Sequence, residues 1–279
     1  MTVEPKSGRL LDLTIAIPTL NCAPTLRWTL ESIRPLQEAG AKVVVADSNS
    51  TDGTREIALA FAESVLTVPK GNMYSAINAA LNHAPSGWMT YINGDDLLYA
   101  DAVQAALREP SDAADVIYAM IDYIDLAGRF LHAWTSTPES ELLPLFARAV
   151  MPIPQQGTLF RRKVFEQLGG FDPHFHLAGD FDFFLRAKLA GFRFERKPLL
   201  RMAAFRIFPA QMSHRSGLSA LTDQARDSVR KNHVTAPRWQ QECAFLKFRL
   251  RNLDSYLVRY LRTRQLTGSF KATSTMDSL

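Results

Sequence analysis

The sequence predicts an α/β fold with a Rossmann-like, mostly parallel central sheet flanked by helices. Three observations predict it. Short apolar runs alternate with stretches of helical periodicity, turns rich in glycine and proline separate them, and a polar cluster follows almost every apolar run. Alternating strands and helices favour a doubly wound sheet whose ligands lie at the carboxyl ends of the strands. We therefore expect the functional site where the polar clusters are.

The first two thirds of the chain contain the strand and helix units. Thr25 is interpreted as the N-cap of the first helix, and Gly40 as its stop. After about Asp115 the pattern becomes β-rich, and a proline-rich loop at 152–154 is expected to build one side of a cleft. The predicted strands are 13–17, 42–46, 64–68, 88–92, 116–123 and 130–135, and the predicted helices are 25–39, 54–62, 73–83, 162–168 and 180–190.

The last part of the chain differs from the rest. From about Gly217 the sequence is basic and helical, and residues 239–266 mix aromatic and leucine side chains with lysine and arginine. We expect a main domain over residues 1–216 and a basic helical C-terminal extension over 217–279. The extension is interpreted either as a helix that docks on an anionic membrane or as one that packs against the main domain or a second subunit, as in a homodimer.

Composition and charge exclude several classes of protein. With 47% hydrophobic and 22% charged residues, the chain has the composition of a folded globular protein. Cys22 and Cys243 show no disulfide or zinc-ligand spacing, so a reducing, cytoplasmic setting is expected. Neither a secretory signal nor an apolar run of about 18 residues is apparent. The net charge of +4 is unevenly distributed and admits an anionic partner: nucleotide phosphates, phospholipid headgroups or nucleic acid would all qualify. The motifs described next favour the nucleotide, and no nucleic-acid partner is expected.

Asn93-Gly94-Asp95-Asp96 is the most informative run. Adjacent carboxylates directly after an apolar strand can hold a hard divalent cation, and such a cation can clamp a diphosphate. The alternative is a turn in which these residues serve backbone geometry alone, and by itself the run leaves both interpretations open.

At this point the sequence resembles glycosyltransferase family 2, over roughly residues 11 to 215. The resemblance implies the GT-A fold, Mn²⁺ or Mg²⁺ as cofactor, and inverting transfer of a sugar from a nucleoside diphosphate, with uridine diphosphate expected, to an acceptor hydroxyl. A glycan or a lipid-linked acceptor in polysaccharide or lipopolysaccharide assembly fits it. The segments that carry the resemblance are Ile15 to Asn21, Asp47 to Thr54, Gly71 to Asn78, Asn93 to Asp96, Pro154 to Arg162, Gly169 to Asp172 and Gly179 to Arg186.

The resemblance also implies roles for single residues on the donor side. Asp47 would accept a hydrogen bond from uracil, Asn93 would contact ribose or sugar, and Asp95 would bind the metal with Asp96 as a second-line ligand. Asp52 is expected to cap the helix that follows it. Ser75 departs from the family, which has an acid there. The donor-binding residues implied are Pro18, Thr19, Asn21, Asp47, Asn78, Asn93 and Asp95.

On the acceptor side the resemblance makes Asp180 the catalytic base, a role for which a carboxylate close to the acceptor hydroxyl is suited. Gly179 departs from the family, which has Glu there. Gln155 and Gln156 are interpreted as acceptor-side contacts or as loop-stabilising residues. Asp182 is expected to pair with Arg186 one turn later. His214 is interpreted as a metal or diphosphate contact or as an exposed side chain.

Other functions remain as alternatives. A catalytically silent sugar-nucleotide-binding protein of the same shape would follow if the departures at Ser75 and Gly179 disable the site. A nucleotidyltransferase would carry a glycine-rich basic loop after the first strand, and residues 21–25 do not form one. A dinucleotide-binding dehydrogenase would carry G-x-G-x-x-G there, and none follows. The donor sugar, the acceptor and the linkage are not specified by any of these motifs.

Overall fold

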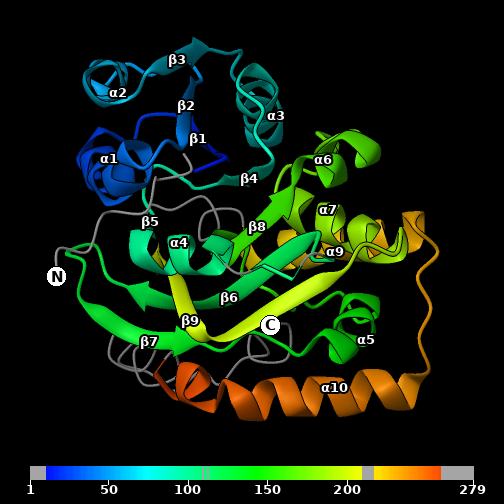
Figure 1. Cartoon of the computed structure of the whole chain (residues 1–279). Helices are drawn as coiled ribbons and strands as arrows, with labels where there is room; N and C mark the ends of the chain where they lie inside the picture. The colour runs from blue at the N-terminus through cyan, green and yellow to red at the C-terminus, as the bar shows by residue number, and fades with distance from the viewer. Residues whose placement is uncertain (1–10, 109, 112, 209–216, 259–279) are drawn as a thin grey trace, which may run out of the picture.

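The computed structural model describes residues 11–108, 110–111, 113–208 and 217–258, and one twisted sheet organises them (Figure 1). The sheet has nine strands in the order β3-β2-β1-β4-β8-β6-β9-β5, with β7 paired to β6. This confirms the predicted α/β fold. The strands are β1 Leu13–Thr19, β2 Lys42–Asp47, β3 Ser64–Thr67, β4 Trp88–Tyr91, β5 Leu97–Leu98, β6 Val116–Ile124, β7 Phe130–Trp134, β8 Thr158–Arg161 and β9 Phe194–Arg206.

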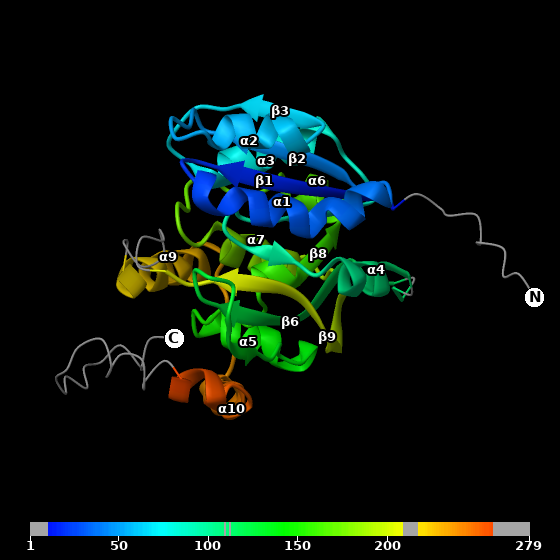
Figure 2. The same cartoon turned by 90° about the vertical axis from the view of Figure 1, so that its left-hand side faces the viewer.

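Helices cover both faces of the sheet (Figures 1 and 2). Two 3₁₀ turns, Glu139–Glu141 and Gln155–Gly157, lie between these elements, and the chain is also helical over 253–258. The helices are α1 Ala23–Glu38, α2 Thr54–Phe61, α3 Met73–His83, α4 Ala100–Arg108, α5 Leu142–Ala147, α6 Arg162–Leu168, α7 Gly179–Leu189, α9 Gly217–Lys231 and α10 Arg238–Arg251.

The amino-terminal half is the parallel part. β1 pairs in parallel with β2 and β4, and β2 pairs in parallel with β3. Alternate residues of β1 enter different cores: Ile15 packs with α1 on one face and Ala16 with α3 on the other. A strand buried on both faces has no polar stripe, which is why β1 is almost wholly apolar.

The second half is mixed. β8 is antiparallel to β4 and to β6, whereas β9 is parallel to β6 and antiparallel to β5. The register between β6 and β9 shifts around Met120, because β9 carries extra residues there. The sheet thereby brings the end of β9 beside the loop that follows β4.

One predicted helix boundary is wrong. α1 begins at Ala23 with Cys22 as its N-cap residue, so Thr25 is not the cap. The Thr25 hydroxyl instead donates a hydrogen bond to the carbonyl oxygen of Gly94 over 2.8 Å. That bond ties the start of α1 to the loop after β4. The predicted helix over 162–168 is confirmed, and Gly169, with φ of 70°, ends it in the left-handed conformation.

The C-terminal helices pack against the main sheet layer. α9 lies on α7, where Ser228 Oγ donates to buried Asp182 over 2.8 Å. Asp182 also pairs with Arg186 over 2.6 Å, as expected. α10 packs through Phe245 and Phe248 on α5 (Figure 2). Over the described residues, no helix is long and apolar enough to cross a membrane. The division of the chain at residue 216 stays a proposal.

Candidate active site

The ends of β1 and β2 form the first part of the site. Pro18 and Thr19 lie in register with Ala46 and Asp47. Asp47 is fully buried, and its carboxylate accepts hydrogen bonds from the Thr19 hydroxyl over 3.1 Å and from the Ser50 hydroxyl over 2.5 Å. The structure therefore fixes the predicted uracil acceptor in place with short local bonds.

The loops after β1 and β2 are bonded to each other. Asn21, with φ of 51°, donates its N–H to Ser50 Oγ over 2.9 Å and accepts the Thr51 N–H over 2.9 Å. Asp52 accepts from the N–H groups of Ala23 and Thr54, each over 3.1 Å, at the starts of α1 and α2. Asp52 therefore supports both helix starts, whereas the prediction gave it α2 alone.

The loop after β4 carries the adjacent carboxylates. Asp96 is fully buried and accepts the backbone N–H of Arg206 over 2.8 Å and the amide of Gln156 over 3.3 Å. Burial first, and then the charge of neighbouring Asp95, raise the pKa of Asp96 well above its usual range. Asp95 is half-buried. Asp96 is thus the anchored member of the pair, and Asp95 the more accessible one.

Arg206, which the sequence analysis did not single out, holds this loop from behind. Its guanidinium is buried and donates to the Asp95 carbonyl over 2.7 Å and to the Leu126 carbonyl over 2.8 Å. It also lies 4.7 Å from the centre of the Trp28 ring. The sequence does mark Arg206, because it is the only charged residue in the otherwise apolar run 202–207, and this could have indicated a buried role.

The donor set around Asp95 fits a hard divalent cation. Asn93 Oδ1 is buried and has no hydrogen-bond partner among the described residues, which is costly unless a ligand or cation occupies the position beside it. Carboxylate and amide oxygens are the ligands that Mg²⁺ and Mn²⁺ prefer. Within the described residues no cluster of three or more His, Cys, Asp or Glu side chains occurs. His214 lies outside the described residues.

Asp180 stands at the amino-terminal end of α7. Its carboxylate accepts the Phe181 N–H over 2.8 Å and the Tyr74 hydroxyl over 3.2 Å. Burial raises the pKa of Asp180, and these two hydrogen bonds oppose the rise. A carboxylate with a raised pKa is a better proton acceptor near neutral pH than an ordinary one.

Two buried tyrosines connect the carboxylates. Tyr74 on α3 is 1% exposed and Tyr91 on β4 is 2% exposed. Burial first, then Tyr74 and the charges of Asp180 and Asp96, raise the pKa of Tyr91 well above its usual range. Both tyrosine rings pack on Phe171, with centroids 5.8 and 5.4 Å from it, so the residue that bonds Asp180 and the strand that leads into the β4 loop share one core.

The departure at Gly179 has a steric explanation. A Cβ at this position would lie 2.7 Å from two atoms of the Tyr74 ring. The ring stacks on Phe171 with centroids 5.8 Å apart and has little room to withdraw. Gly179 thus leaves the space that Tyr74 needs in order to reach Asp180.

The remaining predicted residues have partners within the protein. Gln155 is buried and donates to the Tyr91 carbonyl over 2.7 Å. Asn78 exchanges two hydrogen bonds with the backbone of Phe171, of 2.7 and 2.9 Å. Ser75 is exposed in the first turn of α3, where its N–H donates to Asn72. Substrate contacts by Gln155, Gln156 and Asn78 stay predictions.

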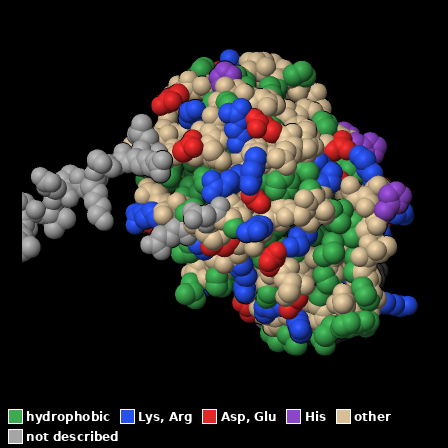
Figure 3. All heavy atoms as spheres, turned by 45° about the vertical axis from the view of Figure 1, so that its right-hand side comes forward, with side chains coloured by type: hydrophobic (Ala, Val, Ile, Leu, Met, Phe, Trp, Pro, Cys, Tyr) green, Lys and Arg blue, Asp and Glu red, His purple; other side chains and the backbone are tan. Residues whose placement is uncertain are grey.

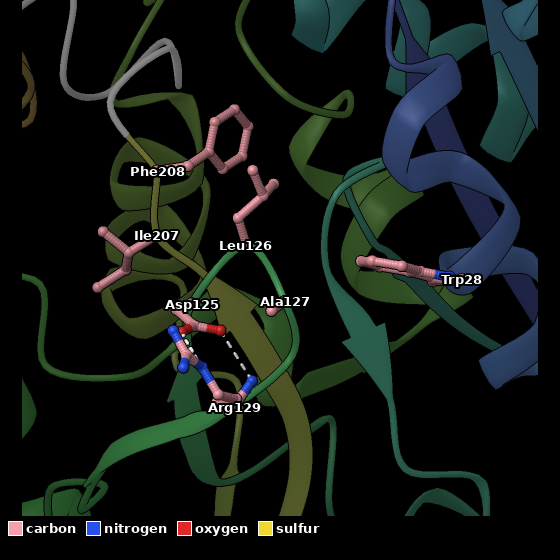
Figure 4. Close-up of a pocket in the computed structure, with 7 residues that line it drawn as sticks. All are labelled: Trp28, Asp125, Leu126, Ala127, Arg129, Ile207 and Phe208. Atoms are coloured by element: carbon pink, nitrogen blue, oxygen red, sulfur yellow. Dashed lines mark hydrogen bonds and ion pairs between the residues drawn. The ribbon is translucent and has the colours of Figure 1, made fainter.

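A pocket of about 510 Å³ is lined in part by Leu126 and Trp28, both of which Arg206 contacts (Figure 4). Leu126, Ile207 and Phe208 lie on one side of it, Trp28 lies across from them, and an ion pair of 2.7 Å joins Asp125 to Arg129. The pocket is therefore largely apolar with a charged edge. Arg206 links it to the carboxylate loop through the bonds to Leu126 and Asp95.

Comparison with known proteins now assigns the family. The family model described as glycosyl transferase family 2 matches residues 14–169, more than half of the chain. The chain belongs to glycosyl transferase family 2. The matched range of this family 2 glycosyltransferase contains the β1, β2 and β4 loops but ends before Asp180.

Curated relatives of this family 2 enzyme include a named glycosyltransferase and a glycan biosynthesis protein. A PGL/p-HBAD biosynthesis glycosyltransferase of Mycobacterium tuberculosis is 30% identical over 182 residues, covering 62% of this chain and 68% of the relative. The succinoglycan biosynthesis protein ExoA of Rhizobium meliloti is 29% identical over 199 residues, covering 64% of this chain and 58% of ExoA.

Solved structures confirm the GT-A fold. S. aureus TarS 1–349 in complex with UDP-GlcNAc matches with a TM-score of 0.62 and 17% identity, covering 87% of this chain and 72% of the TarS chain. Mannosyltransferase PcManGT from Pyrobaculum calidifontis, in complex with GDP-Man and Mn²⁺, matches with a TM-score of 0.59 and 19% identity, covering 93% and 76%. At these identities the likeness concerns the fold alone.

Proposed function

We propose that this family 2 glycosyltransferase moves a sugar from a UDP-sugar to an acceptor hydroxyl with inversion at the anomeric carbon. One observation carries the proposal: Tyr74, which donates to Asp180, and Tyr91, at the end of the strand that leads into the Asp95-Asp96 loop, pack on the same Phe171 ring. A leaving-group site and a proton acceptor on opposite sides of one position are what direct displacement requires.

The chain's own residues supply the proton transfer. Asp180 takes the proton of the acceptor hydroxyl as that oxygen bonds to the anomeric carbon, and the bond from this carbon to the diphosphate oxygen breaks with its electron pair. Asp95, with Asn93 and Asp96, would hold a divalent cation, which when bound neutralises charge on the departing diphosphate. Tyr74 keeps the Asp180 carboxylate oriented through its hydroxyl.

The choice of donor and acceptor is supported by different observations. Asp47, buried at the end of β2 and held by Thr19 and Ser50, is the proposed uracil contact. TarS binds UDP-GlcNAc and PcManGT binds GDP-Man in the same fold, which supports a nucleotide-sugar donor. The relatives in PGL/p-HBAD and succinoglycan biosynthesis support a glycan or lipid-linked acceptor in cell-surface glycan assembly.

Two substitutions test the proposal. Asp180→Asn is expected to lower kcat about 10²- to 10⁴-fold, because the base is lost, with nearly unchanged binding of UDP and Mn²⁺ by calorimetry. Asp95→Ala is expected to abolish the manganese dependence of UDP binding. Asp101→Asn, at an exposed acid of α4, serves as the matched control and should leave both measurements at wild-type values.

The outcomes separate the alternatives. Normal turnover by Asp180→Asn would show that the base is another residue. Manganese-dependent hydrolysis of UDP-sugar by the wild type, lost in Asp180→Asn, supports an active enzyme. A wild type that binds UDP with Mn²⁺ but never releases free sugar, even with a panel of acceptors, would support the catalytically silent binding protein.

A further inference from the structure

The outer side of α10 carries a line of apolar side chains. Trp239, Leu246 and Leu250 are 70%, 59% and 62% exposed, and Cys243 is exposed between them. After a turn at Asn252 the chain is helical again over 253–258. Leu253 and Leu257 continue the line there, 51% and 53% exposed. We call Trp239, Cys243, Leu246, Leu250, Leu253 and Leu257 the seam.

The seam is not the face that holds α10 on the protein. The opposite face, with Ala244, Phe245 and Phe248, is buried against Leu145 of α5. Figure 1 shows α10 along the lower edge of the molecule, and none of the described elements covers its outer side. In Figure 3, turned about the same vertical axis, hydrophobic side chains are visible along that lower edge. An exposed line of apolar side chains of this kind indicates a surface that binds a partner.

The spacing within the seam identifies the kind of partner. Successive seam residues are separated alternately by four and three positions along the chain, the repeat of a two-stranded coiled coil. Because α10 is already ordered by its packing on α5, pairing through the outer side has a reduced entropy cost.

Charges beside the seam favour a second copy of the same helix. Glu242 and Arg249 flank one side of the seam, and Lys247 and Asp254 flank the other. In a parallel, in-register pair each flanking residue faces the residue five positions later on the second copy. Glu242 then faces Lys247 of the second copy, and Arg249 faces Asp254 of the second copy, so both pairs have opposite charges. Within one chain Glu242 already pairs with Arg148, and Lys247 lies 4.0 Å from Glu141, so the contacts between copies would add to these ion pairs.

We infer that the seam pairs with the seam of a second copy of this chain, parallel and in register, to form a homodimer. An anionic membrane is the less favoured partner, because the two acids and two bases that flank the seam balance and do not form a cationic border. α10 lies at the edge of the molecule away from the β1–β4 half (Figure 1), so the dimer leaves both candidate sites open.

The mass in solution tests the inference. Light scattering on the full chain should give twice the 31.2 kDa of one chain. Leu246→Glu with Leu250→Glu should weaken dimerisation at least about 30-fold, as expected on loss of central anchors. Leu199→Glu is the matched control, because Leu199 is 91% exposed on β9 and lies outside the seam, and it should leave the mass unchanged. A monomeric wild type, or a dimer that survives the double substitution with an unchanged dissociation constant, overturns the inference.

Cys243 reports the orientation and does not depend on those variants. In a parallel, in-register pair the two Cys243 thiols lie opposite each other, so diamide, which takes up two electrons and two protons, should join them in a disulfide that Cys243→Ser abolishes. A dimer that gives no such cross-link overturns the parallel register. If the wild type is a monomer that sediments with phosphatidylglycerol vesicles, and the variant with both Leu246→Glu and Leu250→Glu does not, the seam binds lipid. That result would overturn the inference.

Discussion

Replacing Gly179 by alanine should damage the enzyme through one contact. The added Cβ would lie 2.7 Å from the Tyr74 ring, whereas carbon atoms in contact sit about 3.5 Å apart or more, so the ring must withdraw by about 0.8 Å. The Tyr74 hydroxyl is already 3.2 Å from Asp180, and a shift of that size would break the hydrogen bond. Both stability and catalysis should therefore change.

The expected magnitude follows from two opposing effects. Overpacking costs about 1–3 kcal/mol, and exchanging glycine for alanine returns about 0.4–1 kcal/mol by restricting the unfolded chain. We expect a net loss of about 1–2 kcal/mol in the free energy of unfolding, measured by urea denaturation. The turnover of UDP-sugar should fall as well, with the acid limb of its pH profile displaced to higher pH, since Asp180 loses a bond that favours its charged form.

Two further variants isolate the contact. When Tyr74 is also replaced by alanine, the alanine at 179 contacts no ring, so Gly179→Ala should no longer lower the free energy of unfolding. A double-mutant cycle should then give a coupling energy of about 1–2 kcal/mol between the two positions. Gly87→Ala is the matched control: its Cβ would lie 2.3 Å from Asp12 Oδ2, but Asp12 is exposed and can swing away. A Gly179→Ala enzyme with wild-type stability and pH profile would refute the steric account.

Three other substitutions should have distinct effects. Tyr74→Phe keeps the ring but removes the hydroxyl that donates to Asp180, so the pKa of Asp180, which is already raised, should rise further. Because Asp180 is protonated as pH falls through that pKa, the fall in kcat on the acid side of the pH profile should move to higher pH. An unchanged profile would mean that the hydrogen bond has no role in catalysis. A lysine at position 206 cannot reproduce the guanidinium hydrogen bonds behind the Asp95 loop. Because one lost hydrogen bond costs about 1–1.5 kcal/mol, manganese-dependent UDP binding, measured by calorimetry, should weaken about tenfold in Arg206→Lys. Asp182→Asn leaves Arg186 without its buried counter-charge and should cost about 3 kcal/mol in urea unfolding; a loss below about 1 kcal/mol would mean the pair behaves like an exposed one.

The protonation of Asp180 also affects stability. Because its pKa is raised on folding, the folded state binds the proton more tightly than the unfolded state, and stability falls as pH rises through the interval between the two pKa values. Above that interval Asp180→Asn removes the cost of a buried charge. The variant should therefore be at least as stable as the wild type at pH 8, while its turnover is lost.

The parallel half of the fold was predictable because local signals there agree. The strand and helix units from β1 to β4 were each expected within a few residues, since apolar runs and turn residues mark them directly. The boundary of α1 was wrong because the Thr25 hydroxyl serves a tertiary bond to Gly94 in place of a cap. A bond to a residue so distant in sequence leaves no local trace.

β9 escaped prediction for a different reason. Its first half carries Glu195, Arg196, Lys197 and Pro198, and a shift in register there interrupts the alternation that marks a strand. Missing β9 meant missing Arg206, which reaches the β4 loop only because the strand passes beside it. Asp95 and Asp180 were named from the resemblance, whereas the tyrosine pair depends on how α3 packs on the sheet, where it contacts β1 and β2.

The contact between α9 and the start of α7 has a consequence for protein engineering. Gln224 Oε1 accepts the N–H groups of Leu177 and Ala178, over 2.8 and 3.3 Å, immediately ahead of Asp180. A chimera that exchanges everything after residue 216 for the tail of a relative would also exchange the side chain that bonds the backbone just ahead of Asp180. Grafts intended to alter the tail alone should therefore retain Gln224, or carry over the matching segment before α7 from the same source.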